Sequence, residues 1–252
     1  MPRSALFLSG TLLALLTLAA GCGGSSGTTP SVSPAPTATP TPTATPAPAK
    51  YFASAAQAAA CAASNTTGTI KQPPAGAVII VYAMQNDASA TMTGPTGFTD
   101  RDAQHNSPFT FGEWYKIATG SGETSFDWGT SSATVQCNSW VIVFTGEPTS
   151  APFDGHSDNL SKLLSTDGPF STTTVTAKVN DVGVSMLNTG SVEGMGAVAS
   201  FVPSTMVNLG SAEFNNFLFY SQPLVAGPFT ASLTFTAESM YNQIEVEDLI
   251  AP

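Results

Sequence analysis

Residues 77–83 read AVIIVYA and residues 140–144 read WVIVF. Both stretches are short, apolar or aromatic at every position and rich in β-branched residues, a combination that favours strands over helices. A strand that is apolar on both faces is typical of the middle of a sheet with layers packed on either side. These two stretches therefore predict a sheet at the centre of the fold.

Alternating patterns predict further, half-buried strands on either side of this centre. Apolar and polar residues alternate in four segments, residues 109–117, 174–179, 230–237 and 244–250. In a strand, such alternation places the apolar residues on one face. Clusters of turn-forming residues recur roughly every 10 to 15 residues, a spacing that fits antiparallel strands joined by turns rather than βαβ units. The sequence thus predicts an all-β, antiparallel two-sheet sandwich.

Two alternatives stay open within this β-rich region. Residues 53–63 are mostly Ala, the best helix former, but they include no large apolar residue that could pack a helix against a sheet. We favour a strand or an irregular segment there over a helix. We expect one domain over residues 50–252, and the main alternative is a split into two domains near Pro148–Pro169, where the composition is loop-like.

The charge balance excludes one large class of partners. The chain of 252 residues carries 7 Lys and Arg against 17 Asp and Glu, a formal net charge of −10. Nucleic-acid binding needs a basic patch, and these few cations cannot supply one. Because 42% of the residues are hydrophobic and 10% are charged, wholesale disorder is excluded as well.

The first 21 residues have the pattern of an export signal. Arg3 supplies the positive charge, residues 5–20 form an apolar stretch rich in Leu, and small residues follow. The stretch is short for a membrane-spanning helix. We therefore predict a signal peptide over residues 1–21.

Residues 18–22, Leu-Ala-Ala-Gly-Cys, resemble the lipobox of bacterial lipoproteins. In that family the cysteine thiol takes a diacylglyceryl group and the chain is cut just before it. The resemblance implies a lipid anchor at Cys22, which would make a membrane the first partner of this protein. Gly23 follows the cysteine in place of the Asp that retains many lipoproteins in the inner membrane. The implied destination is the outer membrane or the cell surface.

The segment after the lipobox is a linker. Residues 23–49 carry no charge, and Pro alternates there with Thr, Ser and Ala. Such a composition cannot bury enough apolar surface to offset the entropy of ordering the chain. Repeated Pro favours polyproline II at about 3.1 Å per residue, so the linker can act as a stalk. We assign residues 22–49 to the lipidated cysteine and a disordered Pro/Thr-rich linker.

A second resemblance concerns the globular part. Four segments between Asp87 and Gly146 carry it, namely residues 97–99 (GFT), 114–123 (WYKIATGSGE), 126–128 (FDW) and 139–146 (SWVIVFTG). They resemble the repeats of a jelly-roll or concanavalin-like, lectin-like sandwich module of bacterial and phage surface proteins. The resemblance covers about a quarter of the chain and rests on structural residues, so it implies a fold rather than an activity.

The cysteines suggest one disulfide. Of the 3 Cys, the lipobox uses Cys22, which leaves Cys61 and Cys137. An oxidising location outside the cytosol favours a disulfide between these two. The alternative is a pair of buried free thiols.

The search for catalytic residues is mostly negative. His105 and His156 are the only histidines, and neither lies in a metal-ligand motif. No nucleophile elbow, phosphate loop or redox pair is present, so we predict no enzyme activity, no cofactor and no metal. A polysaccharide hydrolase would need two facing carboxylates, and Glu113 and Asp127 are the candidates for that alternative.

Two charged segments look like loops. Residues 154–159 (DGHSDN) gather oxygen ligands, but without the spacing of a calcium loop, so we favour a solvated loop over a calcium site. Residues 100–102 (DRD) are predicted to form a turn with a local ion pair.

Tryptophans are the candidate ligand contacts, because their flat rings stack on sugar faces. Trp140 lies in a stretch that is apolar on both faces and is assigned to the core. Trp114 has the opposite parity to its apolar neighbours, which predicts an exposed ring. We name Trp114 and Trp128 as candidate ligand-stacking residues.

These observations predict a lipid-anchored protein of the cell envelope that displays a non-catalytic sandwich for surface binding or adhesion. A glycan or another envelope protein is the expected partner, and nucleic acid is excluded. The alternatives are an envelope polysaccharide hydrolase and a purely structural protein-interaction module.

Overall fold

The computed structural model describes residues 44–85, 87–106, 109–133, 136–161, 170–191, 198–212, 216–235 and 240–252. Residues 44–252 form one compact unit, in which the described part is all-β and contains 18 strands. No helix in the described part of the chain has the length and hydrophobicity needed to cross a membrane. The predicted signal peptide and Cys22 lie outside the described residues.

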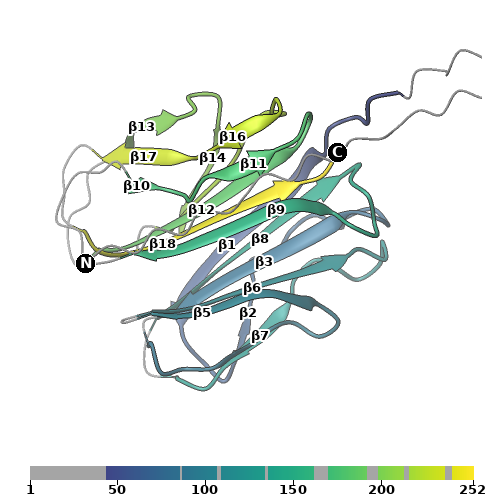
Figure 1. The fold of residues 1–252 in the computed structure, drawn as a ribbon. Helices are drawn as coiled ribbons and strands as arrows, with labels where there is room; N and C mark the ends of the chain where they lie inside the picture. Colours follow the sequence, from purple (N-terminus) through teal and green to yellow (C-terminus); the bar gives the residue numbers. More distant parts are fainter. Residues whose placement is uncertain are drawn as a thin grey trace, which may run out of the picture. The chain divides into compact units, whose positions relative to one another are not determined.

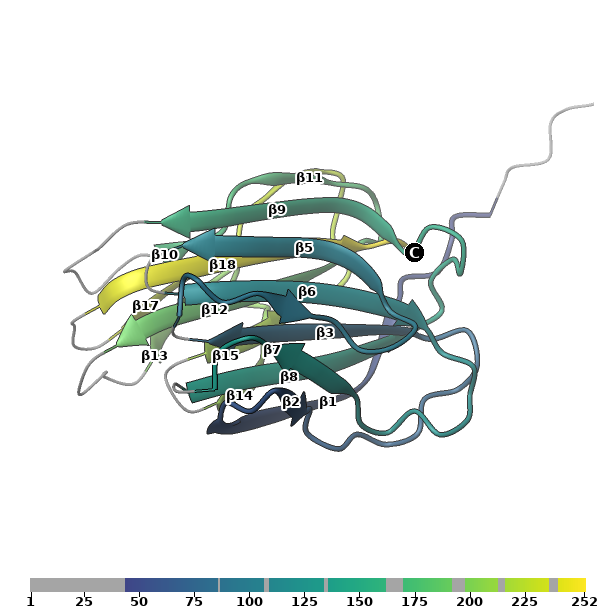
Figure 2. The same cartoon turned by 90° about the horizontal axis from the view of Figure 1, so that it is seen from below.

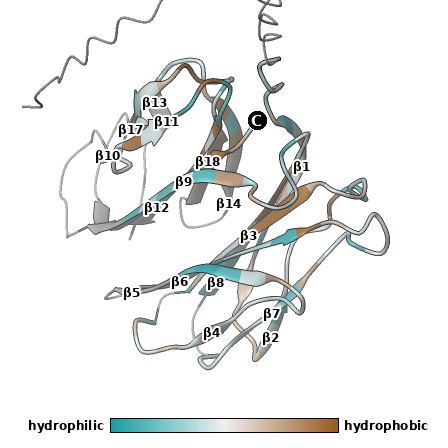
Figure 3. Ribbon diagram, turned by 45° about the vertical axis from the view of Figure 1, so that its right-hand side comes forward, coloured by the Kyte–Doolittle hydropathy of each residue, from teal (hydrophilic) through white to brown (hydrophobic). Residues whose placement is uncertain are grey.

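The first large sheet has five antiparallel strands in the order β1-β8-β3-β6-β5. Their bounds are β1 Lys50–Ala60, β3 Val78–Gln85, β5 Thr99–Asn106, β6 Phe109–Ile117 and β8 Gln136–Thr145. All eight residues of β3 are buried, and Figure 3 shows its hydrophobic colouring. The AVIIVYA and WVIVF stretches thus form neighbouring inner strands, as predicted.

The second large sheet also has five antiparallel strands, in the order β14-β15-β12-β18-β9. Their bounds are β9 Phe153–Ser161, β12 Val182–Ser191, β14 Val207–Ala212, β15 Asn216–Tyr220 and β18 Met240–Ile250. The two large sheets lie face to face (Figure 1). Inward-facing side chains from both sheets form one core cluster, which includes Tyr82, Phe144, Val184 and Leu218. The predicted antiparallel sandwich is therefore present.

Smaller sheets cover the outer faces of both large sheets. A sheet β2-β7-β4 covers the first, and sheets β10-β17-β13 and β11-β16 cover the second. Their bounds are β2 Ser64–Thr66, β4 Met92–Thr93, β7 Asp127–Thr130, β10 Phe170–Ser171, β11 Val175–Ala177, β13 Val198–Val202, β16 Gly227–Phe229 and β17 Ser232–Phe235. These additional layers are needed because both faces of the central strands are apolar.

The two halves of the unit repeat one topology. When the five strands of each large sheet are numbered in the order in which they occur along the chain, both sheets have the spatial order 1-5-2-4-3. The three-stranded sheets β2-β7-β4 and β10-β17-β13 also match. Their strands lie in the same three connections between large-sheet strands, namely first to second, second to third and fourth to fifth. Residues 50–145 and 153–250 thus form two sandwiches with the same topology. In each, the outer face of the large sheet packs on small sheets, and the inner faces of the two large sheets pack on each other to form the central core.

The Ala-rich segment is a strand. Residues 53–60 belong to β1, which pairs with β8 over almost its full length. The loop that contains Gly68 lies close against this strand, and the small side chains of the strand leave room for it. A Cβ added to Gly68 would lie 2.7 Å from the carbonyl oxygen of Ala56. The packing of a sheet overrides the helix propensity of Ala at this site.

Residues 114–123, one of the four segments that carry the lectin-like resemblance, form the end of β6 and the turn that follows it. The carboxylate of Glu123 accepts backbone N–H groups of Thr119 and Gly120, at 2.8 and 3.0 Å, and pairs with Lys116 at 2.7 Å. Gly120 has φ +87°, a conformation that favours glycine. The hydrogen bonds of Glu123 therefore stabilise the turn that follows β6.

Candidate functional site

A cluster of charged side chains lies between the two large sheets, on the side where the edge strands β5 and β9 run together (Figure 2). It is built from two rows of cross-strand neighbours, one in each sheet. Asp102, Glu113 and Tyr82 form the row in the first sheet. His156 and Asp248 form the facing row in the second sheet. We call these residues, together with Arg101, the inter-sheet cluster.

β-Bulges in the two edge strands aim the cluster inward. Strand β5 has one extra residue, Arg101, opposite β6, and β9 has one extra residue, Asp154, opposite β18. Because of the first bulge, the consecutive residues Arg101 and Asp102 both reach the cluster. Bulges and inward-pointing charges are common devices that stop an edge strand from pairing with another chain.

Asp248 is the centre of the cluster. Its Oδ1 accepts hydrogen bonds from Arg101 Nε at 2.7 Å and His156 Nδ1 at 2.9 Å, and its Oδ2 accepts one from the Tyr82 hydroxyl at 2.6 Å. Arg101 also donates from Nη2 to the carbonyl of Gly155 at 2.9 Å. One carboxylate thus connects strands of both sheets.

Burial and pairing set the charges in the cluster. Burial raises the pKa of Glu113 well above its usual range, and the charge of Asp248 adds to the shift. Burial alone would raise the pKa of Asp248 too, but the hydrogen bond from His156 and the charge of Arg101 lower it to about 2. Burial opposes the charged form of His156, yet contacts with Asp102 and Asp248 raise its pKa to about 10. At neutral pH, Asp248 is an anion and Arg101 and His156 are cations, while burial favours the neutral form of Glu113.

This geometry stabilises the fold and does not present reacting groups. Glu113 and Asp248 have no exposed surface, and the side chain of His156 is 25% exposed. A general acid or base must reach the proton that it transfers, and Glu113 and Asp248 are both fully buried. We assign the inter-sheet cluster to holding the two sheets together.

We expect the protein to be most stable in mildly acidic buffer and to lose stability as the pH rises towards about 10. Folding raises the pKa of His156, Glu113 and Glu247, the last to about 8 by burial. Such groups stabilise the fold fully below their unfolded pKa and lose that contribution as the pH passes through the folded pKa. Asp248 acts in the opposite sense and loses its contribution only below about pH 4.

Melting temperatures measured from about pH 4 to about pH 10 test this expectation. High salt is the control, because it screens repulsion among surface charges but leaves buried pairs largely unscreened. The His156→Gln variant should lose part of the alkaline slope. A stability maximum at alkaline pH in high salt would contradict the assignment.

Two sets in this region place metal-ligand atoms within 4.8 Å of one another, Asp102 with His156 and Asp158, and Glu113 with His156 and Asp248. A ligating imidazole must be neutral, whereas the pKa of His156 is raised to about 10. A metal ion would have to displace that proton and lie near the guanidinium of the cluster. Ion pairing therefore accounts for Asp102 and His156 in the first set and for all three members of the second.

The prediction of loops at residues 100–102 and 154–159 is wrong. Both segments are strands, in β5 and β9. The local ion pair expected for Arg101 is replaced by a bond to Asp248, which lies 147 residues away in the sequence. Sequence reasoning missed Arg101 and Asp248 because a bulge leaves no periodic signal, and because a long-range partner cannot be read from spacing.

The proposed hydrolase pair does not form. Glu113 faces the second large sheet, within the inter-sheet cluster. Asp127 lies on β7, beyond the opposite face of the first sheet, where it is exposed and accepts a hydrogen bond from the Thr66 hydroxyl at 2.6 Å. The first sheet separates the two carboxylates, whereas a glycosidase needs both beside one glycosidic bond.

Neither candidate stacking residue offers an exposed ring. Trp114 is 2% exposed and Trp128 is 3% exposed. The parity predicted for Trp114 is right, but the sheet β2-β7-β4 covers the face to which it points. Gly94 and Gly112 lie against its indole so closely that an added Cβ on either would lie 2.3 Å from a ring atom. Trp114 is a core residue, and the expectation of an exposed platform is wrong.

A groove of about 330 Å³ opens beside Trp128, between the end of β1 and the strand β2. We call it the β1–β2 groove. It is lined by Gln57, Ala59, Ala60, Ala62, Ser64, Asn65, Thr66, Thr67, Trp128, Cys137 and Ser139. Amide and hydroxyl groups recur in this lining, and none of these side chains is charged.

The polar groups of the groove differ in how they are engaged. Asn65 is committed to the turn, since it accepts from the N–H of Ala62 and donates to its carbonyl, both at 2.8 Å. Gln57 is exposed and makes one hydrogen bond, at 3.2 Å, to the next carbonyl. The buried Nε1–H of Trp128 has no hydrogen-bond acceptor within the described structure. The groove therefore offers neutral donors and acceptors to a ligand that carries hydroxyl groups.

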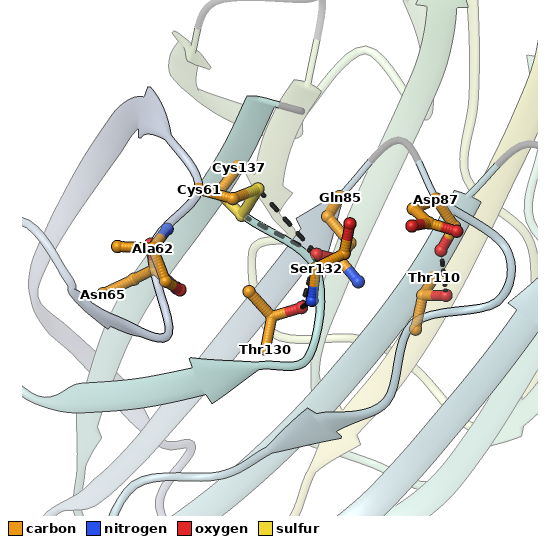
Figure 4. The surroundings of a disulfide bond; sticks show 9 residues. All are labelled: Cys61, Ala62, Asn65, Gln85, Asp87, Thr110, Thr130, Ser132 and Cys137. Atoms are coloured by element: carbon orange, nitrogen blue, oxygen red, sulfur yellow. Dashed lines mark hydrogen bonds between the residues drawn. A yellow bond between two sulfur atoms is a disulfide. The ribbon is translucent and has the colours of Figure 1, made fainter. Parts of the chain in front are cut away.

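A disulfide joins Cys61 and Cys137 (Figure 4), and Cys137 is part of the groove lining. It joins the residue after β1 to the second residue of β8, so the predicted pairing is present. Gln85 lies beside it and accepts a hydrogen bond from the Thr130 hydroxyl at 2.5 Å. The crosslink fixes one wall of the groove to the first large sheet.

Comparison with known proteins gives no further assignment, because no family model, no curated protein and no solved structure matches this chain.

Proposed function

We propose that this protein is a lipid-anchored lipoprotein of the bacterial cell envelope that displays a non-catalytic β-sandwich for surface binding or adhesion. The β1–β2 groove is its binding site, and an uncharged glycan is the ligand. The lipid at Cys22 holds the protein at the outer membrane or cell surface, and the Pro/Thr-rich linker carries the folded unit away from the membrane.

The composition of the groove is the observation that carries the proposal. A groove of about 330 Å³ lies within the size range of small-ligand sites. Its lining of amides and hydroxyls without a charged side chain matches a polyhydroxylated neutral ligand better than an ion or a nucleotide. Each half repeats one five-stranded and one three-stranded sheet, and this repeat supports the resemblance to jelly-roll, lectin-like modules.

Binding is favoured over hydrolysis by the positions of the carboxylates. Glu113 is buried among ion pairs, and Asp127 lies on the other side of the first sheet. Neither lines the β1–β2 groove. These two residues do not form an acid–base pair, and they are the only catalytic candidates that the hydrolase alternative has among the described residues.

A glycan array tests the binding part of the proposal, with the mature chain carrying Cys22→Ser so that it is soluble. We expect a glycan hit whose affinity falls about three- to tenfold in Gln57→Ala, since one hydrogen bond contributes about 0.5–1.5 kcal/mol. Thr99→Ala, an exposed change on β5, is the matched control and should bind normally.

The outcomes separate the alternatives. Cys22→Ser should also move the full-length protein from the membrane fraction to the soluble fraction, and retention in the membrane would refute the lipid anchor. Failure to bind any glycan would turn the assignment to a structural or protein-interaction module. Release of oligosaccharide from a hit would establish a hydrolase.

A further inference from the structure

A second pocket lies where the chain enters β1, at the opposite end of that strand from the β1–β2 groove. It has a volume of about 290 Å³. Residues 48–51, at the start of β1, form one wall, and residues 220–223, at the end of β15, form the other. Because β1 and β15 belong to different large sheets, we call it the seam pocket.

Two tyrosine rings form an aromatic wall of the seam pocket. The rings of Tyr51 and Tyr220 are stacked, with centroids 4.9 Å apart and planes inclined by 6°. Phe144, which is fully buried, contacts both rings edge-on, at centroid distances of 6.2 and 6.0 Å. The hydroxyls of Tyr51 and Ser54 share a hydrogen bond of 2.9 Å. Both tyrosines line the pocket and are only partly buried, so the pair offers an ordered aromatic surface to a ligand.

Hydrogen bonds hold both walls of the pocket in place. Asn180 donates from its side-chain amide to the carbonyl of Pro46 at 2.8 Å, two residues before Pro48. Ser221 and Gly183 exchange two bonds, both of 2.8 Å: the Ser221 N–H donates to the Gly183 carbonyl, and the Gly183 N–H donates to the Ser221 hydroxyl. The walls are therefore ordered in advance, which lowers the entropic cost of binding a ligand.

Polar groups at the rim are available to a ligand. Lys50 and Gln222 line the pocket and are exposed, and their side chains make no hydrogen bond or ion pair within the part of the chain that the structure describes. An ammonium group donates three hydrogen bonds, and an amide both donates and accepts. A sugar ring needs this combination, an aromatic surface for its flat face and polar groups for its hydroxyls.

We propose that the seam pocket is a second glycan site, in which a sugar ring stacks on the Tyr51–Tyr220 pair. This inference rests on the proposed glycan-binding function and adds a site that binds by stacking. The aromatic surface that the buried Trp114 and Trp128 do not offer is thus supplied by tyrosines. Tyr51 and Gln57 are six residues apart on β1, or roughly 20 Å along the strand, so the two sites are separate.

A proline-rich peptide is the other class of ligand that aromatic-lined grooves accept. Proline lacks a backbone N–H, so such a peptide offers mainly acceptors and leaves the amide oxygen of Gln222 unused. Sugar hydroxyls both donate and accept, and they can use both ends of the amide. The rim of the pocket therefore favours a glycan.

Hydrogen exchange of the mature Cys22→Ser chain tests the proposal, with cellohexaose, chitohexaose and maltohexaose as probes. We expect at least one probe to slow exchange in residues 49–51 and 220–222. Lys50→Ala and Gln222→Ala should each weaken this binding about three- to tenfold, the effect of one lost hydrogen bond. Lys71→Ala is the matched control, since Lys71 is exposed and lines neither site, and it should bind normally.

A pair of changes at Tyr220 tests the stacking itself. Tyr220→Phe keeps the ring and should retain binding at the pocket to within about threefold, whereas Tyr220→Leu removes the ring and should weaken it about tenfold. Melting temperatures show whether each variant is folded. Equal weakening by Lys50→Ala and Lys71→Ala, or equal binding by Tyr220→Phe and Tyr220→Leu, would overturn the proposal.

The site of protection separates this inference from the proposed function. Slowed exchange in residues 57–66 alone would overturn the seam pocket as a glycan site and leave the β1–β2 groove standing. Slowed exchange at neither place with any probe would overturn both. A synthetic peptide with the sequence of residues 30–43 is the competing probe. Protection of the seam pocket by this peptide and by no oligosaccharide would assign the pocket to a proline-rich partner and overturn the inference.

Discussion

Asp248→Asn should lower the free energy of unfolding by about 3–5 kcal/mol, the range found when one partner of a buried ion pair is removed. The carboxylate accepts hydrogen bonds from Arg101, His156 and Tyr82 and has no exposed surface. An amide keeps the shape but removes the charge, so Arg101 and His156 would both lose the anion to which they donate. Urea unfolding of the mature Cys22→Ser chain measures the loss.

Glu113→Gln is the matched control for this prediction. Burial and the charge of Asp248 raise the pKa of Glu113 and so favour its neutral form, which an amide replaces with little change in charge or volume. We expect a loss within about 1 kcal/mol, typical of one uncharged hydrogen bond. Asp100→Asn, an exposed change on the same edge strand as Arg101, should be silent. Equal losses in Asp248→Asn and Glu113→Gln would show that the charges of the cluster are assigned wrongly.

Replacing both Cys61 and Cys137 with Ala should destabilise the fold by roughly 3–4.5 kcal/mol. The disulfide joins residues 76 apart, and closing a loop of that length removes much conformational entropy from the unfolded chain. Both residues are buried, so the change also leaves a small gap beside Gln85. The difference in urea midpoint between the oxidised protein and the double variant measures the effect.

Reductant provides the control for the disulfide prediction. Dithiothreitol should bring the unmodified sequence close to the double variant and should not shift the double variant itself. A midpoint that is insensitive to reductant in both proteins would contradict a stabilising crosslink. Because Cys137 lines the β1–β2 groove, ligand affinity measured on the same samples also shows whether the crosslink shapes the groove.

The central strands were predictable because their signal is local. The run at residues 77–83 is apolar throughout, and a strand buried on both faces requires that pattern whatever its partners are. The alternation predicted for residues 109–117 is confirmed as well, since Phe111, Glu113 and Ile117 all face the second large sheet.

The outer layers could not be predicted in this way. Alternation shows that two faces differ, but it does not show whether the second face meets water or another sheet. Trp114 and Glu247 both lie on such second faces, and both are buried under smaller sheets, Glu247 in contact with Ser185. The repeated topology was hidden for a related reason, since strand order depends on pairing between distant segments and leaves no periodicity in the sequence.

The position of the disulfide determines how the folded unit responds to force. A pull on the chain from its N-terminal side reaches β1 first, at Lys50, and can peel that strand from β8 only as far as Cys61. There the load passes through the covalent bond to Cys137. The chain between the two cysteines, roughly 250 Å when extended, is thereby removed from the path of tension. A tethered copy under shear can therefore lengthen by one strand while most of its first half, including β2, β3 and β6, carries no load.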